Sequence, residues 1–279
     1  MERRITFQKM KAFERYLIED EKSRSTIEKY RKDVLAFFKY AGEGKIGKST
    51  VIAYKEILGR SYAVASANSK IAALNKYFRF CGWVDLCVKQ FKVQRKVFCP
   101  AEKELTRAEY HRLVQAAEHD HNQRLSLVLQ TICGTGIRVS ELPYMTVEAV
   151  QRGRAIVSCK GKTRVVFVVS ALRKKLLRYV RERHITAGAI FVTKTGKPMN
   201  RCNIWREMKD LCAQAGVSPG KVFPHNLRHL FARAFYGIEK DIAKLADILG
   251  HSSINTTRIY ISTTGEEHKR YMEHMHLIL

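Results

Sequence analysis

The chain has 279 residues, of which 46% are hydrophobic, enough for two folded domains with ordinary cores. Its net charge is +25, and both halves share the excess: residues 1–100 hold 22 Lys/Arg against 10 Asp/Glu, and residues 101–279 hold 29 against 16. This charge indicates a polyanionic partner that both halves contact, as in a clamp on DNA, although a solvated basic surface would give the same composition.

Membrane insertion, secretion and disulfide scaffolding are excluded by simple patterns. No apolar run approaches the roughly 20 residues that span a bilayer. The N-terminal MERRITFQKMKAFERY is charged and lacks the apolar core of a secretion signal. The seven cysteines have neither a disulfide nor a zinc spacing, so we expect reduced thiols. We therefore expect a cytoplasmic protein without membrane contact.

Residues 1–91 are predicted to form a small all-helical bundle. Apolar residues recur at helical spacing in 7–19 and 64–80. Between these segments, Ser25 and Glu28 have the spacing of a capping box for a second helix, and Ser49 or Thr50 would cap a third. Residues 92–104 (KVQRKVFCPAEKE) are basic and without periodicity, which predicts an interdomain linker.

Residues 105–279 are predicted to form a second domain of mixed α+β structure. Thr106 and Glu109 form a capping box, and later helices are expected at 125–132, 171–184 and 200–215. Two β-branched runs, 155–158 and 164–169, flank Cys159-Lys160-Gly161-Lys162-Thr163 and predict a hairpin with a basic tip; 189–193 would be a further short strand. The predicted fold class is thus mainly α with a small β-sheet.

The most informative stretch is FPHNLRHLFARAFYGIEKDIAKLADILGHSSINTTRIY, residues 223–260. Pro224 starts a helix that places His225 and Arg228, three apart, on one face. Gly250 would cap the next helix and expose His251, and Tyr260 follows nine residues later.

These residue types suit the cleavage of a phosphodiester. Arg138, in Gly-Ile-Arg-Val-Ser-Glu-Leu, and Arg228 present planar forks of donors for the nonbridging oxygens, where charge gathers in the transition state. Lys160 can give a proton to the leaving 5′-oxygen. The tip also carries Lys162, which could be the donor instead, although Gly161 follows Lys160 and favours it.

Tyr260 is the predicted nucleophile. Its phosphotyrosyl ester would store the bond energy for rejoining, so that neither a metal nor a cofactor is needed. A free tyrosine has a pKa near 10, so neighbouring cations must favour the phenolate. His225 and His251 can bond a nonbridging oxygen or help the nucleophile lose its proton.

In order, spacing and local context, this set resembles the tyrosine recombinase (phage integrase) family. The family's first arginine motif matches at Arg138, its hairpin lysine at Lys160, its His-x-x-Arg at His225 and Arg228, its Leu-Gly-His at His251 and its tyrosine at Tyr260. The resemblance implies a site-specific DNA recombinase that acts through a covalent 3′-phosphotyrosyl intermediate. It also implies a helical core-binding (SAM-like) domain and a catalytic domain that close around double-stranded DNA.

The resemblance further implies a homotetramer on two DNA sites, with the apolar C-terminal tail docking on a neighbouring subunit. Because the chain begins directly with the core-binding helices, we expect no arm-binding module and simple sites, as for Xer-type or inversion enzymes. A type IB topoisomerase-like nicking-closing enzyme and a catalytically silent DNA-binding regulator are the alternatives.

Three neighbouring assignments complete the expected site. Glu141 is expected to orient Arg138, because the two stand three apart. Tyr236 and Tyr271 lack the spacing of Tyr260 from His251 and are not favoured as nucleophiles. His229 is expected to turn to another face of the helix, away from Arg228.

Overall fold

The computed structural model describes residues 3–4, 6–42, 46–93, 101–159, 162–193, 195–261 and 272–275. The chain divides into two compact units, Met1–Arg95 and Lys96–Leu279. The predicted boundaries at 91 and 104 stay a prediction, since residues 94–100 lie outside the described ranges. No helix in those ranges is long and apolar enough to cross a membrane.

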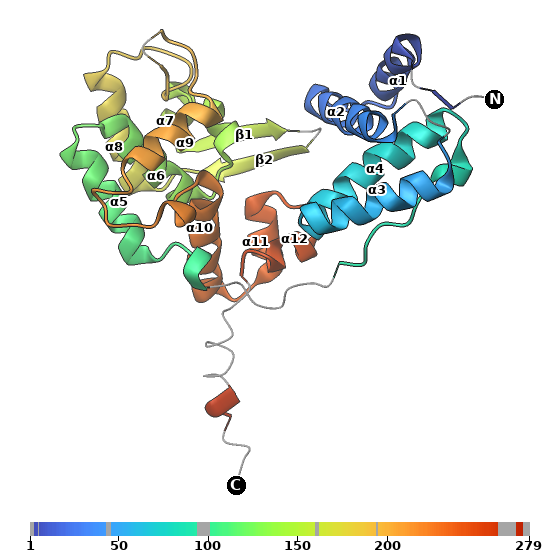
Figure 1. Ribbon diagram of the computed structural model, residues 1–279. Coiled ribbons are helices and arrows are strands. Elements are labelled where there is room, and N and C mark those ends of the chain that lie inside the picture. The colour runs from blue at the N-terminus through green and yellow to red at the C-terminus, as the bar shows by residue number, and fades with distance from the viewer. Residues whose placement is uncertain are drawn as a thin grey trace. The chain divides into compact units, whose positions relative to one another are not determined.

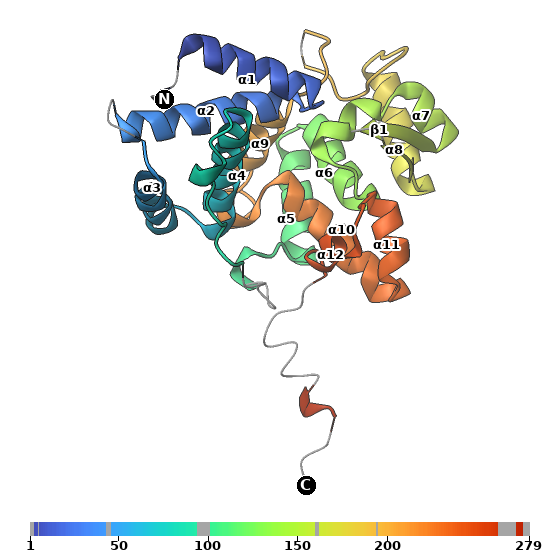
Figure 2. The same cartoon turned by 90° about the vertical axis from the view of Figure 1, so that its right-hand side faces the viewer.

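The N-terminal unit is a helical bundle (Figures 1 and 2). Its elements are α1 (Phe7–Glu19), α2 (Arg24–Ala41), α3 (Lys48–Ser61), α4 (Val64–Phe80) and the 3₁₀ turn η1 (Val84–Leu86). Helices α2 and α3 pack on α4, and α1 packs on α2. The core is aromatic: Phe13 meets Tyr77 edge-on with ring centroids 5.1 Å apart, and Phe37 meets Phe78 at 5.6 Å.

Two helix starts in this unit differ from the prediction. Ser23, not Ser25, caps α2, because Ser23 has the extended backbone of a cap and its side chain accepts from the Thr26 amide. Glu28 pairs with Arg24 at 3.2 Å instead of closing a capping box. Helix α3 begins at Lys48 with Gly47 as its N-cap, two residues before Ser49, the first of the two predicted caps. The predicted helices at 7–19 and 64–80 are confirmed by α1 and α4.

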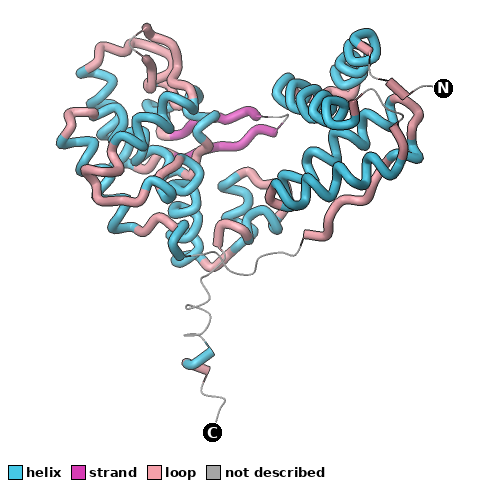
Figure 3. The backbone as a smooth tube through the Cα atoms, in the orientation of Figure 1, coloured by secondary structure: helices cyan, strands magenta, loops and turns pink. Residues whose placement is uncertain are grey.

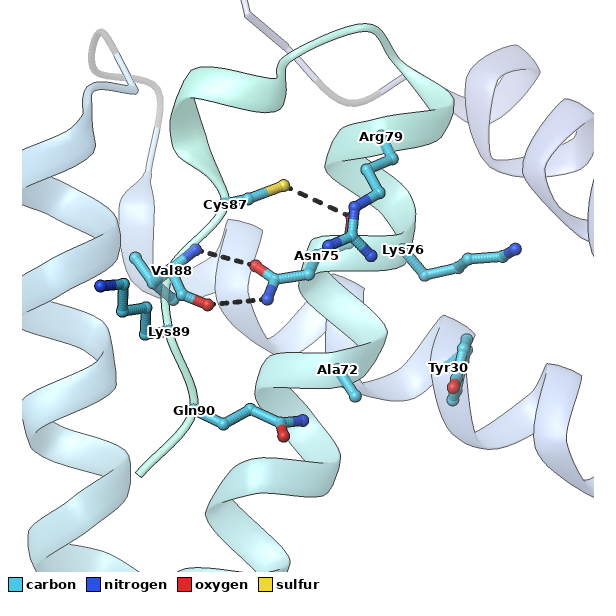
Figure 4. Close-up of a pocket in the computed structure, with 9 residues that line it drawn as sticks. All are labelled: Tyr30, Ala72, Asn75, Lys76, Arg79, Cys87, Val88, Lys89 and Gln90. Atoms are coloured by element: carbon cyan, nitrogen blue, oxygen red, sulfur yellow. Dashed lines mark hydrogen bonds between the residues drawn. The ribbon is translucent and has the colours of Figure 1, made fainter. Parts of the chain in front are cut away.

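Two asparagines of α4 bind the segment that leaves the bundle. Asn75 exchanges a pair of hydrogen bonds with the Val88 backbone, at 2.8 and 3.0 Å, as Figure 4 shows. Asn68, two turns earlier, makes the same pair with the Phe91 backbone, at 2.9 and 2.8 Å. Beside the Asn75 pair lies an open hollow of about 650 Å³, bordered by Tyr30, Arg79 and Lys89 among others.

The C-terminal unit is built around α6 (Gln123–Thr135). Four helices pack on it: α5 (Arg107–His119), α8 (Ser170–Glu182), α9 (Arg201–Asp210) and α10 (Pro224–Glu239). The predicted Thr106–Glu109 capping box is present at the start of α5, and Asn200 caps α9 as expected. The remaining helices are α7 (Val147–Arg152), α11 (Ile242–Leu249) and α12 (Ile254–Arg258), with 3₁₀ turns η2 (Ala101–Lys103), η3 (Val139–Tyr144) and η4 (Pro219–Lys221).

The predicted hairpin forms from β1 (Arg154–Cys159) and β2 (Lys162–Phe167), which are the two strands in Figure 3. The strands are antiparallel, and Ile156 lies opposite Val165. Ala155, Val157 and Val166 enter the core, as the strand period of two requires. The predicted strand at 189–193 is wrong: there the backbone makes only isolated bridges, Thr146 to Ala189 and Val192 to Pro198. The fold class, mainly α with a small sheet, is confirmed.

Candidate active site

Helix α10 supplies three polar side chains in its first two turns. Pro224 occupies the first helical turn, where the amide it lacks would have no partner. His225, Arg228 and His229 follow at spacings of three and four, which place them on one face. Arg228 is only 1% exposed, whereas His225 is exposed and His229 half-buried. The helix therefore carries a cation into the interior and keeps an imidazole at the surface beside it.

The turn after α11 brings a second set of residues to the same place. Gly250 closes α11 with φ +64°, a left-handed conformation that glycine adopts without strain. His251 follows, and Ser253 caps the short helix α12, after which comes Tyr260. In the lower part of the C-terminal unit in Figure 1, α10, α11 and α12 lie together, as their contacts require.

Tyr260 lies among the rings of three histidines. Its hydroxyl is 3.1 Å from Nε2 of His225. Its ring stacks on His229, with centroids 4.2 Å apart and planes 15° from parallel, and lies 4.9 Å from the His251 ring. The Arg228 guanidinium stands 5.8 Å from the ring centroid. The residue as a whole is 6% exposed, so packing on several sides fixes the position of its phenol.

The hydrogen bonds of His251 define its tautomer. A guanidinium nitrogen can only donate, so Nε2 of His251, 3.0 Å from the Arg228 Nη2, must accept and carry no proton. Nδ1 then carries the hydrogen and donates to the Thr257 hydroxyl at 2.9 Å. Burial and the nearby arginines, Arg228 foremost, lower the pKa of His251 to about 4. His251 is therefore neutral at pH 7.

The other two imidazoles are shifted in the same direction. Although His225 as a whole is exposed, His229 and Tyr260 cover part of its ring, and this desolvation, followed by the charges of Arg228 and Arg138, lowers the pKa of His225. Burial, followed by the repulsion that would arise if His225 and His229 were both protonated, lowers the pKa of His229 to about 4. A neutral His225 has one ring nitrogen with a free lone pair, and Nε2 is the nitrogen that faces the tyrosine hydroxyl. The pair can move a proton from phenol to imidazole.

Arg138 and Arg228 reach this site through backbone and carboxylate contacts. Arg228 donates to the carbonyls of Gly136 and Leu249 as well as to His251. Arg138 donates to Glu141 Oε1 at 2.7 Å and to the Gly250 carbonyl at 3.3 Å, and its side chain stays 35% exposed. Burial, and next the charge of Arg138, lower the pKa of Arg228 to about 10, so Arg228 remains a cation at neutral pH.

Five of the six predicted residues thus come together: Arg138, His225, Arg228, His251 and Tyr260. The sixth, Lys160, lies outside the described residues, and so does the side chain of Lys162. Glu141 bonds Arg138 as predicted. The expectation for His229 is wrong: it lies about one helical turn from His225 and shares its face, and its ring stacks on that of Tyr260.

Arg164 was missed by the sequence analysis. It donates to Glu141 Oε2 at 2.7 Å and to the Ile248 carbonyl at 2.6 Å, and its side chain is 11% exposed. The signal was present in the strand pattern. Arg164 stands two residues before the buried Val166, so it shares the inward face of β2, where a cation requires a buried acceptor.

Comparison with known proteins agrees with this architecture. The model of the phage integrase family matches residues 103–267, and the model of the phage integrase N-terminal SAM-like domain matches residues 10–83. Tyrosine recombinase XerA of Pyrococcus furiosus is 27% identical over 284 residues, covering 99% of this chain and 97% of that one. Tyrosine recombinase XerA of Thermococcus kodakarensis is 30% identical over 276 residues, covering 95% and 94%.

Solved structures show the same fold. A crystal structure of a lambda integrase dimer bound to a COC′ core site superposes with a TM-score of 0.74 at 18% identity, covering 93% of this chain and 96% of that one. At this identity the likeness concerns the fold alone.

Proposed function

The chain belongs to the phage integrase family of tyrosine recombinases, and we propose that it cleaves and rejoins DNA strands at specific sites through a covalent 3′-phosphotyrosyl intermediate. The observation that carries the proposal is the hydrogen bond between the Tyr260 hydroxyl and Nε2 of His225, beside the Arg228 guanidinium. A phenol with a base at its hydroxyl and a fixed cation at its ring is arranged to become a nucleophile.

In the proposed cleavage step the Tyr260 oxygen attacks the scissile phosphorus. The new P–O bond to tyrosine forms as the bond to the 5′-oxygen breaks, which leaves the 3′ side of the strand attached to the protein. The phenolic proton passes to His225, which is neutral and within hydrogen-bond distance. Rejoining is the reverse reaction, in which a 5′-hydroxyl attacks the phosphotyrosine. Neither step needs an outside source of energy.

Arg138 and Arg228 are proposed to bind the nonbridging oxygens of that phosphate. Each guanidinium is anchored by acceptors behind it, Arg138 by Glu141 and Arg228 by two carbonyls and His251. An anchored donor needs little rearrangement when charge develops in the transition state. We propose Lys160 as the acid that protonates the leaving 5′-oxygen, with Lys162 as the alternative donor.

The partner is proposed to be double-stranded DNA. The net charge of +25 suits a phosphate backbone. Recombination between two duplex sites cuts four strands, each of which needs one tyrosine. In keeping with the family resemblance, we propose a homotetramer on two sites, with exchange of the C-terminal tail between subunits as the link. A monomeric nicking-closing enzyme would relax supercoils without exchanging strands between sites, so the two activities are separable by assay.

The test is covalent capture on DNA. The protein is mixed with a library of nicked duplexes, from which the short strand beyond the cut diffuses away and traps the covalent form. Wild type should yield a protein–DNA adduct attached at Tyr260, located by peptide mapping. Tyr260→Phe should yield none while it still binds DNA, because the ring packing survives and the nucleophilic oxygen does not.

The matched control is Tyr236→Phe. Tyr236 of α10 is half-buried and packs on the apolar cluster that includes Tyr260, and the Lys240 ammonium lies over its ring. This variant removes a neighbouring phenol without touching the proposed nucleophile, so capture should persist. An adduct formed by the Tyr260→Phe protein would refute the assignment. Exchange of strands between two captured sites would separate recombination from simple nicking and closing.

A further inference from the structure

Three consecutive carbonyls at the end of α11 each accept a hydrogen bond from a different arginine. Ile248 accepts from Arg164 of β2 at 2.6 Å, and Leu249 accepts from Arg228 of α10 at 2.6 Å. Gly250 accepts from Arg138, at the start of η3, at 3.3 Å. One helix terminus therefore holds arginines from three separate elements of the C-terminal unit.

The physics of a helix end explains why cations gather there. The last four carbonyls of a helix have no amide partner within the helix, and the aligned peptide dipoles give this end a partial negative charge. A guanidinium group can donate hydrogen bonds to the unpaired carbonyls and also bring a positive charge to the negative end of the helix. Arg138 and Arg228 are the proposed phosphate ligands, so the terminus fixes their positions relative to each other.

Arg164 is the member of this group to which the proposed cleavage step assigns no role. Its second hydrogen bond goes to Oε2 of Glu141, at 2.7 Å. Oε1 of the same carboxylate holds the Arg138 guanidinium at 2.7 Å, and Oε2 also accepts from the Arg138 amide at 2.9 Å. Glu141 is 1% exposed, so its negative charge is shared between two arginines without competition from water.

The stem of Arg164 also limits the turn that presents His251. A methyl group placed on Gly250 would collide with Cδ of Arg164 and come within 2.9 Å of its Nε. The packing of Arg164 therefore leaves room only for glycine at the residue before His251. Through Glu141 and through this turn, one side chain contacts the supports of two proposed catalytic residues.

We propose that Arg164 is a positioning residue for strand cleavage, which sets the Arg138 guanidinium through Glu141 and the His251 turn through Ile248 and Gly250. The inference rests on the proposed function, because it concerns the same phosphate site. Arg164 itself does not touch the substrate. Its removal leaves Glu141 with one arginine and the Ile248 carbonyl without its partner, so Arg138 loses the fixed geometry that transition-state binding needs.

The test compares Arg164→Met and Arg164→Lys with wild type in single-turnover cleavage at saturating DNA. Methionine keeps the apolar stem and removes both donors, whereas lysine keeps the charge with a single donor atom. We expect Arg164→Met to cleave about 10-fold to 100-fold more slowly, by analogy with the range for side chains that orient the ligands of metal sites. Arg164→Lys should recover part of this loss, with DNA affinity nearly unchanged in both.

A second substrate separates positioning from general damage. A methylphosphonate at the scissile position replaces one nonbridging oxygen by a neutral methyl group, so an arginine that neutralises that oxygen matters less. If Arg164 acts through Arg138, the defects of Arg164→Met and Arg138→Ala should both shrink on this substrate. An equal defect of Arg164→Met on both substrates would overturn the inference, and so would a wild-type rate on the natural phosphate.

The control is Arg154→Met, which removes the same charge from the exposed face of strand β1 in the same hairpin. It should cleave at the wild-type rate at saturating DNA. Wild type and Tyr260→Phe are run in parallel. A wild type that forms no adduct refutes the proposed function, whereas an active wild type with a fully active Arg164→Met refutes only the role of Arg164. Should Arg164→Met fail to fold, Arg164→Lys on the two substrates decides.

Discussion

Arg228 shows how a buried cation can be kept in a protein interior. It is the largest fully buried side chain among the described residues, with 1% of its surface exposed. A charge in such a place is expensive unless its donors are paired. Arg228 donates to two carbonyls and to His251, and its ring neighbour Tyr260 adds a cation–π contact. The stability of the site and its proposed catalytic charge therefore depend on the same side chain.

Arg228→Lys tests both dependences. Lysine keeps the charge but concentrates its donors on one nitrogen, so it cannot reach Gly136, Leu249 and His251 together. We expect the cleavage rate to fall at least ~10²-fold, as when one donor to a developing oxyanion is lost. The free energy of unfolding should fall by about 1–3 kcal/mol, because buried acceptors lose their partners. Single-turnover cleavage and urea unfolding measure the two effects.

The control is Arg233→Lys, on the same helix but bonded to Glu104 and to the Leu105 carbonyl outside the site. It should unfold more easily and yet cleave at nearly the wild-type rate. A cleavage rate for Arg228→Lys within a few fold of wild type would remove this arginine from the proposed phosphate site.

Single residues also show what a sequence can predict about a site. His225, Arg228 and His251 were found because helical spacing and a glycine cap are local signals. His229 obeys the same spacing, but the sequence alone does not say what its ring touches, and its partner Tyr260 is 31 residues away. Arg164 required knowledge of which carbonyls lie opposite β2, and those belong to α11. Contacts over such separations are set by tertiary packing, not by local pattern.

At the scale of elements, α11 and its C-terminal turn organise the candidate site. Gly250 has φ +64° and lies against Arg164, so two independent constraints require glycine there. Gly216 offers a comparison, because its φ is +59° but nothing lies within 4 Å of the position its Cβ would take. Both glycines have a left-handed backbone conformation, but only Gly250 has a side chain, that of Arg164, against the position that a Cβ would take.

Replacing each by alanine separates these constraints. Gly216→Ala should lower the free energy of unfolding by about 1–2 kcal/mol, the cost of a left-handed conformation for an L-residue, with cleavage unchanged. Gly250→Ala should cost more and also slow cleavage about 10-fold, because Arg164 must move and disturb Glu141 and Arg138. Thermal unfolding and covalent capture measure both. Equal effects of the two substitutions on cleavage would show that the turn does not transmit through Arg164.

The elements themselves were largely predictable. Helices α1 and α4 matched their predicted bounds because long amphipathic segments carry a strong periodic signal. The segment 189–193 was predicted as a strand from its apolar residues. Ile190 and Phe191 are indeed buried, but their backbone bonds go to Met145 and Met199 singly and form no ladder. Burial can be inferred from such a short run, whereas pairing depends on a partner that the sequence does not name.

At the scale of the molecule, the clustered imidazoles make stability depend on pH. The pKa of His229 and that of His251 are both lowered to about 4, chiefly by burial, from an ordinary value of 6.5. Between these values the unfolded chain binds protons that the folded chain does not. The contribution of these two histidines to the free energy of unfolding is therefore complete above pH 6.5 and is lost as the pH falls toward about 4.

We expect the free energy of unfolding, from urea titrations at pH 7.5, 6.5, 5.5 and 4.5, to decline through this window. His229→Phe should reduce the decline, because phenylalanine keeps the stack on Tyr260 and cannot titrate. His111→Gln replaces an exposed histidine of α5 and should leave the decline as it is.

Carboxylates with lowered pKa values also reduce the free energy of unfolding as the pH falls, but below about pH 4.5, the usual pKa of glutamate. Glu141 is an example: burial alone would raise its pKa, but its hydrogen bonds to Arg138 outweigh burial and lower it. A decline in His229→Phe as steep as in wild type would show that this histidine is protonated in the folded protein without cost. The same result would contradict the neutral state inferred for the His229 ring stacked on Tyr260.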